Sequence, residues 1–241
     1  MDYTYETEEE EDYTPHRRFR PKKIIRFIFK LIAYTIILGT FAVLLGRMQL
    51  AKTPKDFREF TWTSTALEAY AADPQNFTVN LQEPYTNMDE DGWYKATEVA
   101  LCESAGEVQV TFRYNSRSTI NTLMEKYGLT ERPSGETFVF MLRDGSGKVY
   151  TEYTFAETSR PLYEFRRIVF TGVNFTALES LYLDVFYGED VSENAKMNYT
   201  FVVYDNEKSV LPYKIGNSNK IKETELTFRS NPAYINRLDE E

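Results

Sequence analysis

The strongest constraint on this chain is an apolar segment near the N-terminus, residues 24–45. Its last fifteen residues, 31–45, read LIAYTIILGTFAVLL and contain no charge. A hydrocarbon core about 30 Å thick needs roughly 20 helical residues, so the segment must include residues 24–30. Arg26 and Lys30 lie there on one helix face, where both can extend their charges to the lipid headgroups. The segment predicts one transmembrane helix over residues 21–46.

The basic residues on either side of the apolar core predict its direction. Seven Lys and Arg residues precede it between Arg17 and Lys30, and four follow it between Arg47 and Arg58. This bias favours a cytoplasmic N-terminus and an extracytoplasmic C-terminal domain. A cleaved signal peptide is the alternative, but only the poor cleavage candidate around Ala51 follows the segment, so an uncleaved anchor is favoured.

Small residues form a stripe on the predicted helix. Thr35, Gly39, Ala42 and Gly46 are spaced four, three and four apart, which places them on one face. Such a stripe allows close approach of a second transmembrane helix, although small residues are also common in membrane helices generally. The stripe is therefore a hypothesis for packing within the membrane.

Charge and composition divide the remaining chain into regions. Residues 1–20 combine an acidic block with a basic block and few apolar side chains, so a disordered cytoplasmic tail is predicted. A juxtamembrane linker is expected at 47–60, an extracytoplasmic domain at 61–230 and a C-terminal tail at 231–241. Residues 47–241 contain 30 acidic and 21 basic residues, which disfavours nucleic acid as a partner.

Alternation of apolar and polar residues dominates the predicted domain. In residues 107–114, Val108, Val110, Phe112 and Tyr114 share one face of a strand, while the intervening side chains are mostly polar. A hairpin is predicted where Gly145 and Gly147 separate two such runs. Strands are expected at 77–81, 93–101, 107–114, 138–142, 149–155, 167–171, 181–187, 199–204, 210–215 and 224–229.

Two helical segments interrupt this pattern. Residues 61–72 predict a short helix capped by Ser64 or Thr65, and residues 118–127 predict another that begins at Ser118 and ends at Gly128. The fold class is therefore mainly β: an extracytoplasmic β-sandwich with one or two short helices, preceded by the transmembrane helix. An Ig-like and a jelly-roll topology both fit.

Catalytic motifs are missing from the predicted domain. The only histidine is His16, in the basic tail, so the domain lacks histidine-based triads and histidine metal ligands. The only cysteine, Cys102, lies in the apolar sequence VALCES and is interpreted as a buried structural thiol. We predict no enzyme, catalytic residue or cofactor, and a two-carboxylate hydrolase is the class that composition leaves open.

Residues 87–98 partly match a calcium-binding loop. Asp89, Asp91, Gly92 and Glu98 occupy positions 3, 5, 6 and 12, but Asn87 replaces the usual first aspartate and a lysine stands at position 9. An acidic turn between strands is the simpler interpretation, so we predict no metal site.

The two tryptophans suggest a second kind of site. Trp62 and Trp93, with the many tyrosines, could form a surface on which sugars stack, although alternating aromatics more often form a core. The leading prediction is a single-pass protein of the bacterial cell envelope whose β-sandwich binds another protein. A membrane-anchored module that binds carbohydrate or cell wall is the alternative.

Overall fold

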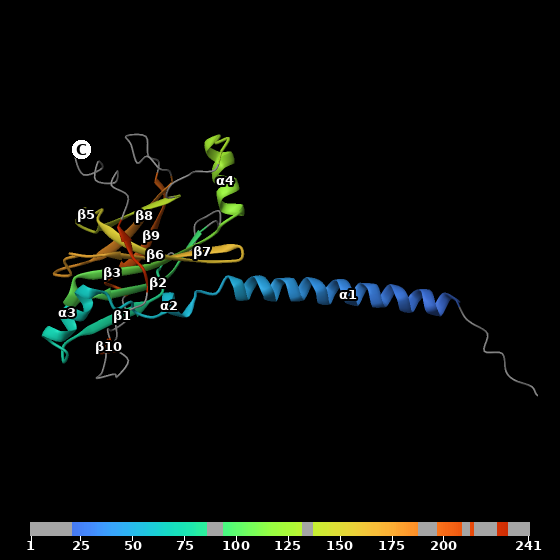
Figure 1. Cartoon of the computed structure of the whole chain (residues 1–241), viewed down its shortest axis with the longest axis horizontal. Coiled ribbons are helices and arrows are strands. Elements are labelled where there is room, and N and C mark those ends of the chain that lie inside the picture. The colour runs from blue at the N-terminus through green and yellow to red at the C-terminus, as the bar shows by residue number, and fades with distance from the viewer. Residues whose placement is uncertain are drawn as a thin grey trace, which may run out of the picture. The chain divides into compact units, whose positions relative to one another are not determined.

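The computed structural model describes residues 21–85, 94–131, 137–187, 197–208, 213–214 and 226–230. The chain divides into two compact units, residues 1–49 and 50–241. The first unit contains helix α1 (Pro21–Leu50), which Figure 1 shows as one continuous helix. This helix is long and apolar enough to span a membrane, as predicted, and continues four residues beyond the predicted end at 46.

The second unit is mainly β and contains two antiparallel sheets (Figure 1). The larger sheet has the order β10-β1-β2-β3-β7-β6-β11 and the smaller the order β5-β4-β8-β9. The strands of the larger sheet are β1 (Thr78–Gln82), β2 (Tyr94–Cys102), β3 (Glu107–Asn115), β6 (Tyr153–Arg160), β7 (Tyr163–Phe170), β10 (Tyr213–Lys214) and β11 (Arg229–Ser230). Those of the smaller sheet are β4 (Phe138–Asp144), β5 (Val149–Tyr150), β8 (Ser180–Tyr187) and β9 (Met197–Asp205).

One hydrophobic core joins the two sheets. The larger sheet contributes the predicted apolar face of β3, with Val108, Val110, Phe112 and Tyr114 all buried. The smaller sheet contributes alternate residues of β4, β8 and β9, such as Phe140, Leu183 and Phe201. Aromatic rings pack edge to face across this core, as Phe112 does with Phe140 at 5.0 Å between ring centroids. The alternation predicted for β3 is therefore confirmed.

The predicted strand at 149–155 is divided between the two sheets. Tyr150 pairs with Leu142 in the smaller sheet, whereas Tyr153 pairs with Phe170 in the larger one. The prediction of one strand here was wrong because the chain changes sheets between residues 150 and 153. Most of the β6–β7 hairpin was also not predicted: its strands pair from Tyr153 with Phe170 to Arg160 with Tyr163.

Further differences occur at the C-terminal strands. In the predicted strand 224–229, residues 224 and 225 lie outside the described part of the chain and residues 226–228 are not in a strand. Arg229 and the following Ser230 pair with β6. Of the predicted strand 210–215, Tyr213 and Lys214 form β10, and the other residues lie outside the described part of the chain.

Within the described residues, α3 (Ser64–Ala72) and α4 (Ser118–Tyr127) are the two predicted helices, and a further short helix, α2 (Lys55–Arg58), lies in the predicted linker. The bounds of α4 agree with the prediction, and Gly128 ends it with a positive φ of 65°. The predicted N-terminal caps were wrong, whereas the predicted C-terminal cap of α4, Gly128, is confirmed. Thr63 caps α3 by accepting from the Ala66 amide, and the Asn115 side chain accepts from the amide of Ser118 at the start of α4.

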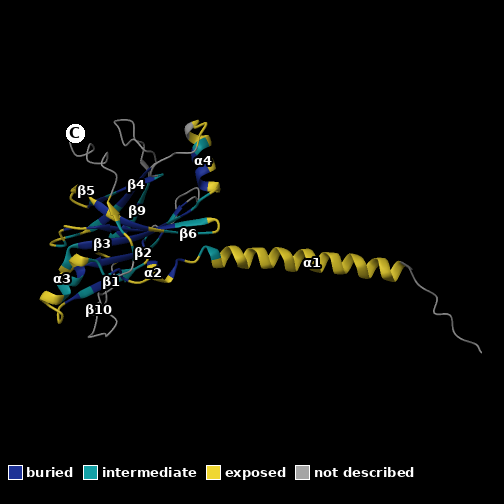
Figure 2. Cartoon of the chain, viewed as in Figure 1, coloured by how far each residue is buried: buried dark blue, intermediate teal, exposed yellow. Residues whose placement is uncertain are grey.

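The outer face of the larger sheet, which faces away from the smaller sheet, is also covered. Helix α3 packs over β1 and β2, where Ala66, Phe77, Val79, Ala100 and Cys102 form a second cluster. A third cluster joins Phe57 to Ala156 and Phe165 on β6 and β7, with Leu226 and Phe228 beside it. Figure 2 accordingly shows the central strands buried, whereas α1 is exposed along its length.

Candidate functional site

Residues 51–63 form a segment that we call the strap. It packs on the outer face of the larger sheet, against polar residues of β2, β3 and β7. It includes α2 and leads into α3. Thr53, Phe57, Phe60 and Thr61 are buried, so the strap is packed against the sheet although much of it was predicted to be a linker at 47–60. The division of the chain into compact units places residues 50–60 with the β domain.

A β-bulge in β2 provides a residue that binds the strap. Ala96 pairs with Phe112 and Glu98 with Thr111, so Thr97 is an extra residue between them. The bulge lets Ala96 and Val99 both reach the main core although they are three residues apart. Thr97 then accepts a hydrogen bond from Thr53 of the strap at 3.2 Å and donates one to the Glu98 carboxylate.

The C-terminal part of the strap is held by Gln109. Its side-chain carbonyl accepts from the Thr61 amide at 3.0 Å, and its amide group donates to the Thr61 carbonyl at 2.8 Å. Glu107 lies beside it and accepts from Thr63 at 2.5 Å and from Gln109 at 3.2 Å. Gln109 therefore supplies both hydrogen bonds that a neighbouring strand would have supplied to Thr61.

The middle of the strap is held by its backbone carbonyls. The Phe57 carbonyl accepts from the Thr111 hydroxyl at 2.7 Å and from the Arg167 guanidinium, which also donates to the Glu59 carbonyl at 2.9 Å. Arg167 is fully buried, and its Nε and Nη1 atoms have no hydrogen-bond partner among the described residues. Arg167 therefore depends on the strap for the hydrogen bonds that offset its burial.

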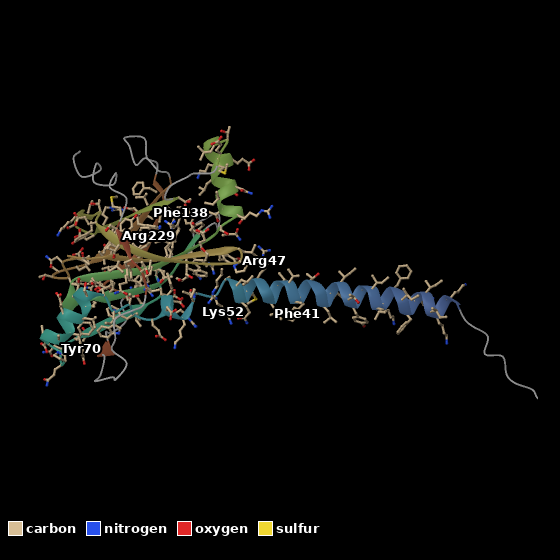
Figure 3. All side chains as sticks on the ribbon, viewed as in Figure 1. Phe41, Arg47, Lys52, Tyr70, Phe138 and Arg229 are labelled. Carbon is tan, nitrogen blue, oxygen red and sulfur yellow. The ribbon has the colours of Figure 1, made fainter. Side chains whose placement is uncertain are left out.

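The N-terminal part of the strap is held by two further arginines. Arg113 donates to the Ala51 carbonyl at 2.5 Å, and Arg160 donates to the Lys52 carbonyl at 2.9 Å. Arg113 also lies over the ring of Tyr163, 5.1 Å from its centroid. These contacts hold the chain immediately after α1 ends at Leu50. Figure 3 labels Lys52 at this point.

Burial changes the acid–base properties of the charged groups beneath the strap. It raises the pKa of Glu107, an effect opposed by the hydrogen bonds from Thr63 and Gln109. It also raises the pKa of Glu98, although the hydrogen bond from Thr97 and the charge of Arg167 act in the opposite direction. Burial lowers the pKa of Arg167 to about 10, and Glu98 partly offsets this effect. Both carboxyl groups therefore retain their protons more strongly than they would in water.

A second charged cluster lies on the inner face of the larger sheet. Arg166 is buried, donates to the Phe138 carbonyl at 3.3 Å and lies 3.8 Å from the Glu157 carboxylate. Glu157 also binds Arg229 of β11. Burial strongly raises the pKa of the neighbouring Tyr114, whose hydroxyl donates to Glu164. This cluster connects β4, β6, β7 and β11.

These contacts suit a structural role. The hydrogen bonds of Gln109, Thr111 and Arg167 go to the backbone of the strap. Among the described residues no group of three or more His, Cys, Asp or Glu side chains could hold a metal ion. The arrangement can thus fix the position of the strap on the sheet.

Two residues singled out from the sequence lie in the cluster beneath α3. Cys102 is buried, as predicted, and burial raises the pKa of its thiol to about 11. Trp62 is half-buried and stacks on Phe77 at 5.3 Å, with Tyr70 edge-on at 5.7 Å. One face of the indole is thus already covered by protein.

Several other candidate residues lie outside the described residues. They are His16, Trp93 and most of the loop 87–98, of which only residues 94–98 are described. On α1, the hydroxyl of Thr35 donates to the Leu31 carbonyl at 2.9 Å, and Gly39 and Gly46 have no atoms near their potential Cβ positions.

The residues that hold the strap were not predicted from the sequence. A signal for the bulge was present, because the apolar alternation of β2 changes phase between Ala96 and Val99. The polar residues of β3 were assigned to one face, but nothing in their order indicated that this face is buried. Arg167 was placed in a strand without any expected role.

Comparison with known proteins identifies no relative. The chain matches no protein-family model, and neither a curated protein nor a solved structure is significantly similar to it.

Proposed function

We propose that this protein is a single-pass membrane protein that presents a non-enzymatic β-sandwich outside the cytoplasm for interaction with another protein of the cell envelope. The observation that carries the proposal is the exposed apolar surface of α1. Its side chains are exposed around the helix, with Phe27, Leu38 and Met48 each at 65% or more. A helix in a soluble domain would bury one apolar face, whereas lipid accommodates all of them.

The bias of seven basic residues before the apolar core against four after it supports a cytoplasmic N-terminus. The common core of the two sheets supports a sandwich, for which Ig-like and jelly-roll topologies remain alternatives. The non-enzymatic part of the proposal is supported by the lack of histidine in residues 17–241 and of any complete catalytic motif in the sequence.

Cysteine labelling in intact cells tests the orientation. The wild-type chain supplies the background, because its only cysteine is buried. We expect Ser146→Cys, on the exposed β4–β5 turn, to react with a membrane-impermeant maleimide in intact cells. The His16→Cys variant should react only after the cells are opened. Labelling of His16→Cys but not Ser146→Cys in intact cells would reverse the topology.

Crosslinking of the full-length protein in its native membrane tests the type of partner. A photo-crosslinking residue can be placed at Tyr182, on the outer face of the smaller sheet, and at Val149 as a second position. A discrete protein adduct that depends on the position would support the proposal. Retention of the detergent-solubilised protein on insoluble cell wall, with no protein adduct, would favour the carbohydrate-binding alternative.

A further inference from the structure

The first residues of the strap follow directly after α1, and the part of the β domain that binds them is the end of β6. Helix α1 ends at Leu50, and the Lys52 carbonyl is held by Arg160 at the end of β6. Two residues of fully extended chain span at most about 7 Å. If α1 crosses a membrane, as proposed above, the Arg160 side chain at the end of β6 is therefore bonded to the chain two residues after the end of the membrane-spanning helix.

The tip of the β6–β7 hairpin is located at this end of the sheet. Arg160 ends β6, Tyr163 begins β7, and the turn between them consists of Pro161 and Leu162. The Leu162 carbonyl accepts from the Ser116 amide at 3.1 Å, which fixes the turn beside the end of β3. The side chain of Leu162 is 39% exposed, so the tip presents an apolar group to its surroundings.

The backbone of Leu162 is unusual for its residue type. Its φ is 76°, in the left-handed region where glycine or asparagine would meet less strain. A leucine at this position is unfavourable for the turn itself. An apolar contact made by its side chain outside the domain would give a reason for its presence.

Basic residues are linked to the tip although the domain as a whole is acidic: Arg160 precedes the turn and bonds the Lys52 carbonyl, and Arg117 follows Ser116, which bonds Leu162. Lys52 and Arg117 are exposed, and Arg160 is half-buried. The nearby carboxylate of Glu164 accepts a hydrogen bond from Tyr114 on the inner face of the sheet. Basic groups beside an apolar tip match a membrane surface, with phosphates outside and acyl chains beneath.

We propose that the tip of the β6–β7 hairpin rests on the outer leaflet of the membrane that α1 crosses. Leu162 enters the interface between headgroups and acyl chains, and Arg117, Arg160 and Lys52 face the phosphates of anionic lipids. The contact fixes the orientation of the domain relative to the bilayer. This inference depends on the proposed membrane anchor.

Fluorescence of the full-length protein in nanodiscs tests the inference. An environment-sensitive dye is attached to Leu162→Cys, and the lipids include anionic phosphatidylglycerol and a lipid with a quencher just below the headgroup. Val149→Cys is the matched control, because Val149 has a similar exposed fraction of 38% and precedes the opposite end of β6. The eight residues of β6 separate the two ends by roughly 23 Å. We expect a blue-shifted, quenched dye at position 162 and neither effect at 149.

A third labelled position separates this inference from the proposed anchor. Phe41 lies in the apolar core of α1 and is labelled in Figure 3. Strong quenching of Phe41→Cys by a deep quencher, with positions 162 and 149 indistinguishable, would overturn the inference and leave the anchor intact. Absence of quenching at position 41 would overturn both. Replacing the anionic lipid with a neutral one should weaken quenching at 162 only, and equal quenching would contradict the role of the basic residues.

Discussion

Removal of the Phe57 side chain should release the strap from the sheet. Phe57 is 1% exposed and packs against Ala156 and Phe165, so Phe57→Ala deletes a buried ring from the third cluster. Truncation of a buried phenylalanine typically costs about 3–5 kcal/mol, because a cavity is left in addition to the lost transfer free energy. We therefore expect Phe57→Ala to lower the free energy of unfolding by about 4 kcal/mol.

Phe57 also takes part in the hydrogen bonds of the strap, so its substitution should release the strap locally as well as lower the stability of the whole domain. Its carbonyl accepts from Thr111 and from the buried Arg167. If the strap moves, the Arg167 charge loses its partners, and a buried donor without a partner costs about 1–3 kcal/mol. The ring and the carbonyl of Phe57 should therefore hold the strap cooperatively: loss of the ring contacts should also break the hydrogen bonds to the carbonyl.

Two measurements on the full-length protein in detergent check this expectation. Urea unfolding followed by tryptophan fluorescence gives the free energy, and limited trypsin digestion reports local release at Lys55 and Arg58, which are exposed within the strap. Glu59→Gln is the control, since it removes the exposed Lys55–Glu59 ion pair, which contributes little, and leaves both trypsin sites intact. If Phe57→Ala destabilises the domain no more than this control and digestion is unchanged, the strap does not depend on the sheet as described.

Three further substitutions test separate features. Because the pKa of Glu107 is raised above its ordinary value of 4.5, the wild-type domain should lose stability as pH rises through the folded-state pKa. Glu107→Gln should reduce this loss to the part that Glu98 contributes, and identical pH profiles in urea unfolding would contradict the assignment. Gly106 has a φ of 62°, and an added Cβ would meet the Val173 carbonyl at 3.3 Å. Gly106→Ala should therefore destabilise the domain by about 1–2 kcal/mol, and by more than Gly128→Ala, where the same φ strain occurs without crowding. Leu162→Asn should raise the melting temperature by about 2 °C, because asparagine tolerates positive φ, and a lower value would refute the strain argument.

Local patterns in the sequence were sufficient for the elements whose side chains follow one period. The alternation in β3 correctly predicted its apolar face, and the spacing of Ile120, Leu123 and Met124 correctly predicted α4. The N-terminal caps were less predictable, because the Asn115 side chain accepts from the amides of Arg117 and Ser118, so that Ser118 is already inside the helix. The break between β5 and β6 was also missed, since both segments alternate in the same way whichever sheet they join.

The candidate site was harder to predict than the strands around it. Gln109, Thr111 and Arg167 are polar residues in strands where polar and apolar side chains alternate. This pattern usually indicates that the polar face is exposed to solvent. Their burial depends on a segment about 50 residues earlier in the chain than Gln109 and Thr111. A contact over this distance leaves no periodic signal in either segment.

The sequence by itself determined the apolar helix, its basic flank and the mainly β character of the domain. These properties follow from hydrophobicity and spacing within short windows, where neighbouring residues share one environment. Only the tertiary structure decided that the segment after the helix is a strap on the sheet, and that Arg113 and Arg160 hold its first residues. The reason is physical: a polar side chain is suited to water or to a backbone carbonyl, and only the folded chain decides which of them it meets.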